Sequence, residues 1–75
     1  MENEIHNFCI KVCCKEVGMQ DELIVSGLLN SYDLMELISI LEERFSIEFS
    51  IEEITETNNF STVDNIIKIV KNKIQ

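Results

Sequence analysis

The residues best placed for chemistry lie in residues 26–36, with Ser31 at the centre of the stretch. Asn30 is a good helix N-cap, and Asp33 three residues later can complete a short form of the reciprocal cap. Ser31 then falls in the first helical turn, where the helix dipole and unpaired N–H groups would stabilise a phosphate ester on its hydroxyl. No His or Lys stands nearby in the sequence to act as a base, so the hydroxyl suits modification by another enzyme better than nucleophilic attack. Taken alone, a serine at a helix start is most often a structural residue.

A second group of reactive side chains occurs near the N-terminus, where His6, Cys9 and Cys13 share one helical face. Structural zinc sites usually bring four ligands from two segments, and no fourth ligand is evident, so no metal site is predicted. Cys9 and Cys13 also fall on an apolar stripe, where cysteine behaves as a small hydrophobic residue, and Cys14 is expected to face outward. Three crowded cysteines do not make a disulfide framework, so reduced thiols in a cytoplasmic protein are predicted.

Length and charge restrict the classes of protein to which this chain can belong. A chain of 75 residues with 45% apolar residues supports one domain, residues 1–75, and leaves little room for the deep cleft of an enzyme, so no enzymatic activity is expected. The net charge is −8, and residues 21–56 hold ten acidic groups against Arg44 alone. Such a surface repels phosphate backbones and anionic headgroups, so we expect basic protein partners, no nucleic acid and no membrane insertion. No stretch has the pattern of a secretory signal or a membrane span.

Apolar residues recur at helical spacing in residues 5–13, 34–45 and 63–74. Gly18 is the expected stop of the first helix, and Ser61 or Thr62 is the expected N-cap of the third. These stretches are long enough for amphipathic helices that pack against one another. They predict three long helices.

The connections between these stretches have patterns of their own. Residues 50–53 form a capping box that opens one short helical turn through Ile54. The connection from Gly18 to Asn30 is rich in aliphatic residues, so it is expected to pack on the core, and such ordered loops before a helix are frequent functional sites. Residues 47–49 alternate apolar and polar side chains without a partner strand, so they are expected to form an extended loop. The predicted fold is therefore all-α, a small bundle of three long helices and one short helix.

Much of the sequence resembles a known family, the acyl and peptidyl carrier proteins. The resemblance runs through residues 27–31 (GLLNS), 37–45 (LISILEERF), 47–49 (IEF) and 59–66 (NFSTVDNI). The family pattern is a glycine, one or two residues, Asp-Ser and an aliphatic residue, followed by a helix with a run of glutamates that ends in phenylalanine. The resemblance covers most of the chain after residue 22.

This resemblance implies a four-helix bundle in which Ser31 carries 4′-phosphopantetheine, derived from coenzyme A. The thiol of that arm would then hold acyl or aminoacyl groups as thioesters. Two positions depart from the pattern, because Asn30 stands where the family usually has Asp and Tyr32 where it usually has Leu or Met. Asn keeps the capping geometry but lacks a carboxylate, which the resemblance suggests assists the modifying enzyme and its metal ion. Tyr32 keeps an apolar body beside the arm and adds a hydroxyl, which changes the surface offered to partner enzymes.

The helix that begins at Ser31 carries a run of acidic side chains beside Met35. A charge run is usually a solvated helix face, but here a docking surface for basic partner enzymes is at least as well supported. Such a surface would act on encounter rate and orientation and would weaken with salt. Met35 and Ile40 fit minor positions in the core as well as they fit this docking surface. The predicted partner-binding residues are Tyr32, Met35, Glu36, Ser39, Glu42 and Glu43.

An apolar cargo gains about 25 cal/mol for each Å² that it withdraws from water, which a bundle permits if its helices separate slightly. An aminoacyl cargo would not need such an opening, so a rigid bundle would favour it. The residues predicted to line an acyl-chain site are Leu34, Ile38, Leu41, Ile54, Phe60, Val63 and Ile67.

Three functions follow in order of preference. The first is an acyl carrier protein that presents thioester-bound intermediates to enzymes of fatty acid or polyketide type. The second is an aminoacyl carrier of the D-alanyl or peptidyl kind, and the third is an unmodified acidic adaptor. The partners expected for a carrier are a phosphopantetheinyl transferase, an acyl- or aminoacyl-loading enzyme, and synthases or transferases with basic docking surfaces. A monomer suits such a mobile shuttle.

Overall fold

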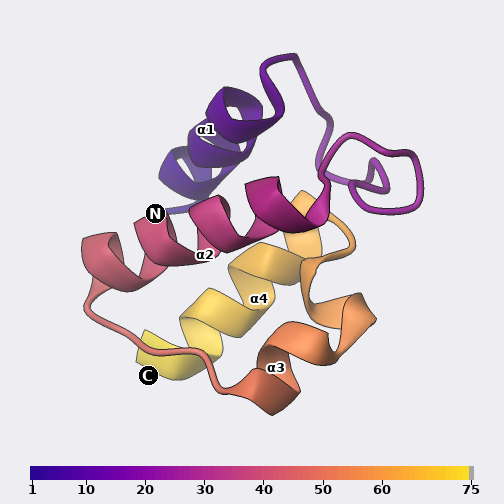
Figure 1. Ribbon diagram of the computed structural model, residues 1–75. Helices are drawn as coiled ribbons and strands as arrows, with labels where there is room; N and C mark the ends of the chain where they lie inside the picture. Colours follow the sequence, from indigo (N-terminus) through magenta and orange to yellow (C-terminus); the bar gives the residue numbers. More distant parts are fainter. Residues whose placement is uncertain (75) are drawn as a thin grey trace.

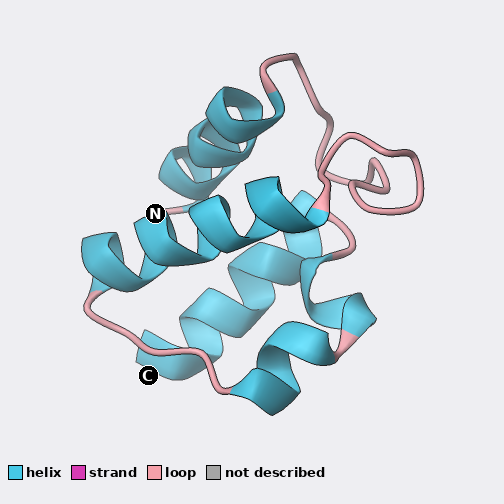
Figure 2. Ribbon diagram, in the orientation of Figure 1, coloured by secondary structure: helices cyan, strands magenta, loops and turns pink. Residues whose placement is uncertain are grey.

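The structure, a computed structural model shown in Figures 1 and 2, describes residues 1–74, which form helices and loops with no strand among them. The helices are α1 (Glu2–Cys13), α2 (Ser31–Phe45), the short α3 (Ile51–Thr55) and α4 (Val63–Ile74), with a single 3₁₀ turn, η1 (Thr57–Phe60), before α4. The predicted all-α domain of three long helices and one short helix is confirmed. Within residues 1–74, no helix combines the length and the apolar character needed to cross a membrane.

The three long helices surround one hydrophobic core. α1 packs against both α2 and α4, and η1 packs against the start of α4 (Figure 1). Each long helix contributes the apolar stripe that its sequence predicts, so the stripes meet in the middle of the domain. The core residues are Ile5, Cys9, Val12, Val17, Leu23, Leu29, Leu37, Ile38, Leu41, Phe49, Phe60, Val63, Ile66, Ile67 and Val70.

The first helix ends earlier than the sequence suggests. Gly18 was the expected stop, but α1 ends at Cys13, and Cys14 takes the left-handed conformation with a φ of 61°. The chain must leave the helix here because Val17 turns inward and is buried in the core. Gly18 instead begins a turn, in which its N–H donates to Asp21 Oδ2 at 2.8 Å. The prediction of Gly18 as the helix stop was therefore wrong by one turn.

The caps of the two C-terminal helices follow the sequence closely. Ser50 and Glu53 form the predicted capping box at the start of α3, with N···O distances of 2.8 and 3.1 Å. Of the two expected caps for α4, Thr62 is the one used, since its Oγ1 accepts the N–H of Asn65 at 3.1 Å. Phe49 lies in an extended loop and is buried, as predicted for residues 47–49.

Residues 14–30, between α1 and α2, form an ordered loop that packs on the core. Leu23 is fully buried, and its N–H donates to Ser61 O at 2.8 Å. Its carbonyl accepts the N–H of Leu29, also at 2.8 Å, which closes the loop on itself. Gly27, with a φ of 82°, supplies the left-handed turn within it. The loop therefore delivers the chain to the start of α2 from a fixed direction.

Candidate functional site

Ser31 is the first residue of α2, and its side chain is exposed. Asn30 is the N-cap, as predicted, because its Oδ1 accepts the N–H of Asp33 at 2.8 Å. The Asn30 carbonyl accepts the N–H of Leu34 at 2.9 Å and so begins the helix. The cap is one-sided, since among the described residues no bond returns from the Asp33 carboxylate to the Asn30 N–H. The Ser31 hydroxyl thus lies in solvent at the positive end of a 15-residue helix dipole.

Two large side chains near Ser31 are exposed to solvent. Tyr32 is 76% exposed and Met35 is 50% exposed, both within the first two turns of α2. Ile40, which the sequence could not place, is half-buried and packs against the core. A single exposed apolar side chain is ordinary, but neighbouring ones on one helix can form part of a contact site between proteins. Met35 therefore belongs to the surface and Ile40 to the edge of the core.

The acidic residues of α2 have different environments. Glu36, Ser39 and Glu43 are exposed. Glu42 is half-buried, and its Oε2 accepts the backbone N–H of Phe49 at 2.9 Å. One oxygen of the Glu42 carboxylate therefore fixes the loop that follows α2, a role that the sequence did not reveal. Of the predicted docking residues, Glu36 and Glu43 are the carboxylates that project into solvent.

Most cations of the described residues form ion pairs with acidic side chains of the same chain. Arg44 pairs with Glu4, and the lysines of α4 pair with acidic residues of α1, α3 and α4 itself. The three lysine pairs are Lys71–Glu2, Lys73–Glu53 and Lys68–Asp64. These pairs bring the mildly basic C-terminal segment close to neutrality. The unpaired acidic groups that remain lie in residues 16–56, the part of the chain that contains Ser31.

The residues predicted to line an acyl-chain site belong to one apolar cluster. Five of them are buried, and the other two, Leu34 and Ile54, are half-buried at its margin. Phe60 is fully buried, and its ring meets the ring of Phe49 edge to face, with centroids 5.4 Å apart. Together these side chains pack the interior between α2, η1 and α4. The five buried residues are Ile38, Leu41, Phe60, Val63 and Ile67.

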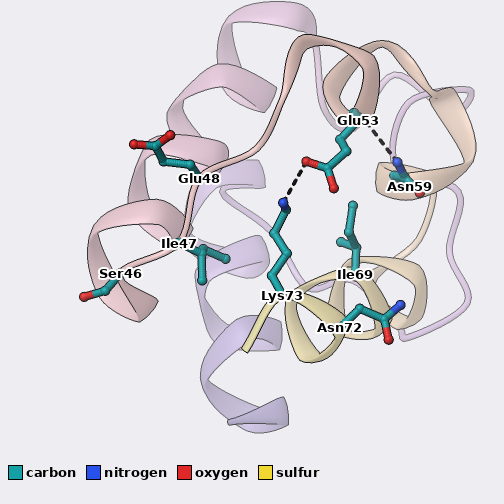
Figure 3. A pocket seen from close by; sticks show the side chains of 8 residues that line it. All are labelled: Ser46, Ile47, Glu48, Glu53, Asn59, Ile69, Asn72 and Lys73. Atoms are coloured by element: carbon teal, nitrogen blue, oxygen red, sulfur yellow. Dashed lines mark hydrogen bonds and ion pairs between the residues drawn. The ribbon is translucent and has the colours of Figure 1, made fainter. Parts of the chain in front are cut away.

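A large surface pocket lies away from Ser31 and contains none of the predicted site residues. It is an open groove of about 620 Å³ between the loop after α2, the α3–η1 region and the end of α4. Figure 3 shows that Lys73 reaches across it toward Glu53. The residues that line it are Ser46, Ile47, Glu48, Glu53, Asn59, Ile69, Asn72 and Lys73. Because four separate segments contribute to it, no sequence motif indicates it.

The histidine and cysteine side chains of α1 that could be reactive have structural roles. His6 Nε2 hydrogen-bonds to the carbonyl of Val17, which fixes the chain after α1. Cys9 is fully buried, and burial raises the pKa of its thiol to about 12, so it stays protonated and unreactive at neutral pH. Burial also raises the pKa of the half-buried Cys13 thiol, whereas Cys14 is exposed as expected. Within residues 1–74, no group of three potential ligands is placed to hold a metal ion.

The Asn30 cap gives a prediction for stability. Replacing Asn30 with Ala removes the acceptor of the Asp33 N–H and is expected to lower the free energy of unfolding by about 1 kcal/mol. Asn30→Asp keeps an acceptor and adds a negative charge at the helix start, so it should be neutral or slightly stabilising. Urea denaturation followed by circular dichroism measures both changes. Asn7→Ala, at an exposed position within α1, is the control, and an equal loss in that variant would contradict the capping role.

Two comparisons with known proteins give no match, so the function is argued from the residues of this chain. No protein-family model matches the chain, and a search of the curated proteins finds no match either.

Proposed function

We propose that this protein is a carrier whose Ser31 receives a 4′-phosphopantetheine arm and presents acyl groups on that arm as thioesters. The observation that carries the proposal is the exposed Ser31 hydroxyl at the first position of α2, within the stretch that resembles the carrier family. A modifying enzyme must reach this hydroxyl, and an exposed first-turn position permits that. The capped helix start also suits the phosphodiester of the arm, because the positive end of the helix dipole stabilises its negative charge.

The attachment would proceed at the Ser31 oxygen. The hydroxyl oxygen would form a bond to the pantetheine-bearing phosphorus of coenzyme A, the pyrophosphate linkage would break, and the nucleotide half would leave. The proton of the hydroxyl would pass to a base on the transferase. The arm, when bound, supplies the thiol that carries cargo. The residues of this chain supply the anchor, its exposure and the surface around it.

Partner enzymes would recognise the surface around Ser31 by charge and by apolar contact. Tyr32 and Met35 offer exposed apolar surface, and Glu36 and Glu43 are unpaired carboxylates on the same helix. Most cations of the chain are already paired elsewhere, so this face attracts basic proteins at a distance. These features support synthases, transferases and loading enzymes with basic docking surfaces as partners.

Charge reversal on this face is expected to slow modification. The variant with Glu36→Lys and Glu43→Lys should lower kcat/KM for a phosphopantetheinyl transferase by about tenfold, because electrostatic steering raises the encounter rate. The difference should shrink as salt rises, since the screening length falls from about 8 Å at 0.15 M to about 3 Å at 1 M. The variant with Glu16→Lys and Glu56→Lys, both exposed and outside α2, has the same change of net charge and is the control. Equal effects of the two changes would assign the loss to net charge alone.

The proposal is tested by intact mass after incubation with coenzyme A and a phosphopantetheinyl transferase. The native chain should gain one phosphopantetheine group, and Ser31→Ala should gain none. Transferases of different specificity should be tried, because Asn30 lacks the carboxylate that the family usually offers. No gain with any of them, and none after Asn30→Asp, would favour an unmodified acidic adaptor. A gain only after Asn30→Asp would identify a carrier that is poorly modified because of that one residue.

A further inference from the structure

The short helix α3 has little apolar anchorage of its own. It has five residues, none of them buried, and only Ile54 packs partly against the core. Its apolar anchors lie outside it, in Phe49 before it and Phe60 at the end of η1. A helix this short is not stable by itself, so its position depends on the contacts that tie it to its neighbours.

Three polar contacts tie α3 and its preceding loop to three different elements. Glu42 Oε2 accepts the N–H of Phe49 at 2.9 Å and ties the loop to α2. Lys73 Nζ lies 2.7 Å from Glu53 Oε1 and ties α3 to the end of α4. Asn59 Nδ2 donates to the carbonyl of Glu53 at 3.0 Å and ties α3 to η1. Figure 3 shows the last two contacts meeting at Glu53.

Lys73 is the most shielded cation in these ion pairs. Its side chain is 20% exposed and that of Glu53 is 32% exposed, whereas the Lys68 side chain is 69% exposed. Lys73 Nζ also lies 5.3 Å from the centre of the Phe49 ring, which in turn contacts Phe60. The hydrogen bond from Lys73 holds the pKa of the Glu53 carboxyl below its usual range. The pair therefore links the surface of α3 to the aromatic side chains of the core.

We propose that Glu42, Glu53, Asn59 and Lys73 form a latch that holds α3 closed over the core and thereby sets the shortest acyl chain that the bundle admits. This inference rests on the proposed carrier function. An acyl chain that entered the core from the side covered by α3 would have to displace Ile54 or Phe49, because both pack in the core cluster there. Displacing either one moves α3 or its loop and breaks contacts of the latch.

The latch favours short acyl or aminoacyl cargo held outside the core. Each methylene group of a cargo that enters the core adds to the driving force for opening, so short chains gain too little to break the latch. An aminoacyl group gains even less, because its ammonium would lose its hydration in the core. A shielded ion pair with a cation–π contact contributes about as much as the burial of one or two methylene groups. The latch should therefore raise the shortest acyl-chain length that enters the core by about one or two methylene groups.

The latch is tested first in the unmodified protein, by amide hydrogen exchange under native conditions. Lys73→Met keeps an apolar stem but removes the ion pair, and Lys68→Met removes an exposed ion pair from the same helix. Exchange at the N–H groups of Ile54 and Phe49 should become about tenfold faster in Lys73→Met. It should stay unchanged in Lys68→Met, with the amide of Val70 in the core as the reference. Equal exchange in the two variants would overturn the latch, whether or not Ser31 accepts an arm.

The second test uses the modified protein. Straight-chain acyl arms from acetyl to octanoyl, lengthened one carbon at a time, are attached from the matching acyl-coenzyme A, and methyl signals of Leu41, Val63 and Ile67 are followed by NMR. The chain length at which these signals begin to move should be longer in the native protein than in Lys73→Met, by about one or two methylene groups. The same onset in both proteins would overturn the proposal. Failure of every arm to attach would count against the carrier function, while the exchange measurement would still decide the latch.

Discussion

Phe60→Ala is expected to remove about 3–5 kcal/mol from the free energy of unfolding. Phe60 is fully buried, and its ring fills the space between the start of α4 and Phe49. A domain of 75 residues has a total stability of about 4–11 kcal/mol, so the variant should lose a large share of it. Urea denaturation followed by circular dichroism would show the midpoint falling to a clearly lower urea concentration.

Two variants separate the cavity from other effects of this change. Phe60→Leu keeps most of the apolar volume and should lose clearly less stability than Phe60→Ala. Ile51→Ala removes an aliphatic side chain that is 76% exposed, and its effect should stay within about 0.5 kcal/mol. A small loss in Phe60→Ala, similar to that of Ile51→Ala, would show that Phe60 does not organise the core.

Leu23→Ala is expected to lower the free energy of unfolding by about 2–5 kcal/mol and to loosen the loop that leads to Ser31. The Leu23 side chain is fully buried, and its backbone joins the loop to Ser61 and Leu29. Loss of the side chain weakens the anchor on which those two hydrogen bonds depend. Under the proposed carrier function, modification of Ser31 should therefore slow even where the rest of the variant is folded, because α2 then begins from a mobile loop.

The effect of Leu23→Ala is measured by urea denaturation, by limited proteolysis of residues 14–30 and by the rate of Ser31 modification. Val25→Ala, in the same loop at a position 81% exposed, is the control for stability. It should lower the free energy of unfolding by no more than about 0.5 kcal/mol and leave the proteolysis pattern unchanged. A proteolysis pattern shared by both variants would mean that Leu23 does not hold the loop.

The sequence predicted those parts of the structure that depend on local spacing. The helical stripes of α1, α2 and α4 follow from apolar residues at helical intervals, and the caps at Asn30 and Ser50 follow from residue types three positions apart. The exposed position of Ser31 is likewise local, since it follows from the cap that precedes it. These features form within a few residues of chain, so their pattern is visible without the tertiary fold.

The features that the sequence did not predict depend on contacts between distant segments. The end of α1 at Cys13 is set by the burial of Val17 in a core built by other helices. Glu42 looks like any surface glutamate of α2 until the loop after α2 brings the Phe49 N–H to it. The Lys73–Glu53 pair joins residues twenty positions apart, and no local rule selects one acid among many as its partner. Charge patterns indicated that this surface is acidic, but not which carboxylates stay unpaired.

The ion pairs of Glu2 and Glu4 also determine how this domain could be attached to something else. Glu2 pairs with Lys71 near the end of α4, and Glu4 pairs with Arg44 at the last turn of α2, so both ends of the described chain lie at one pole of the molecule (Figure 1). Ser31 lies at the opposite end of α2, about 22 Å away along a 15-residue helix. A tether, a fused neighbouring domain or a solid support joined at either terminus would therefore leave Ser31 facing outward. Such immobilised protein should keep its serine accessible to soluble enzymes.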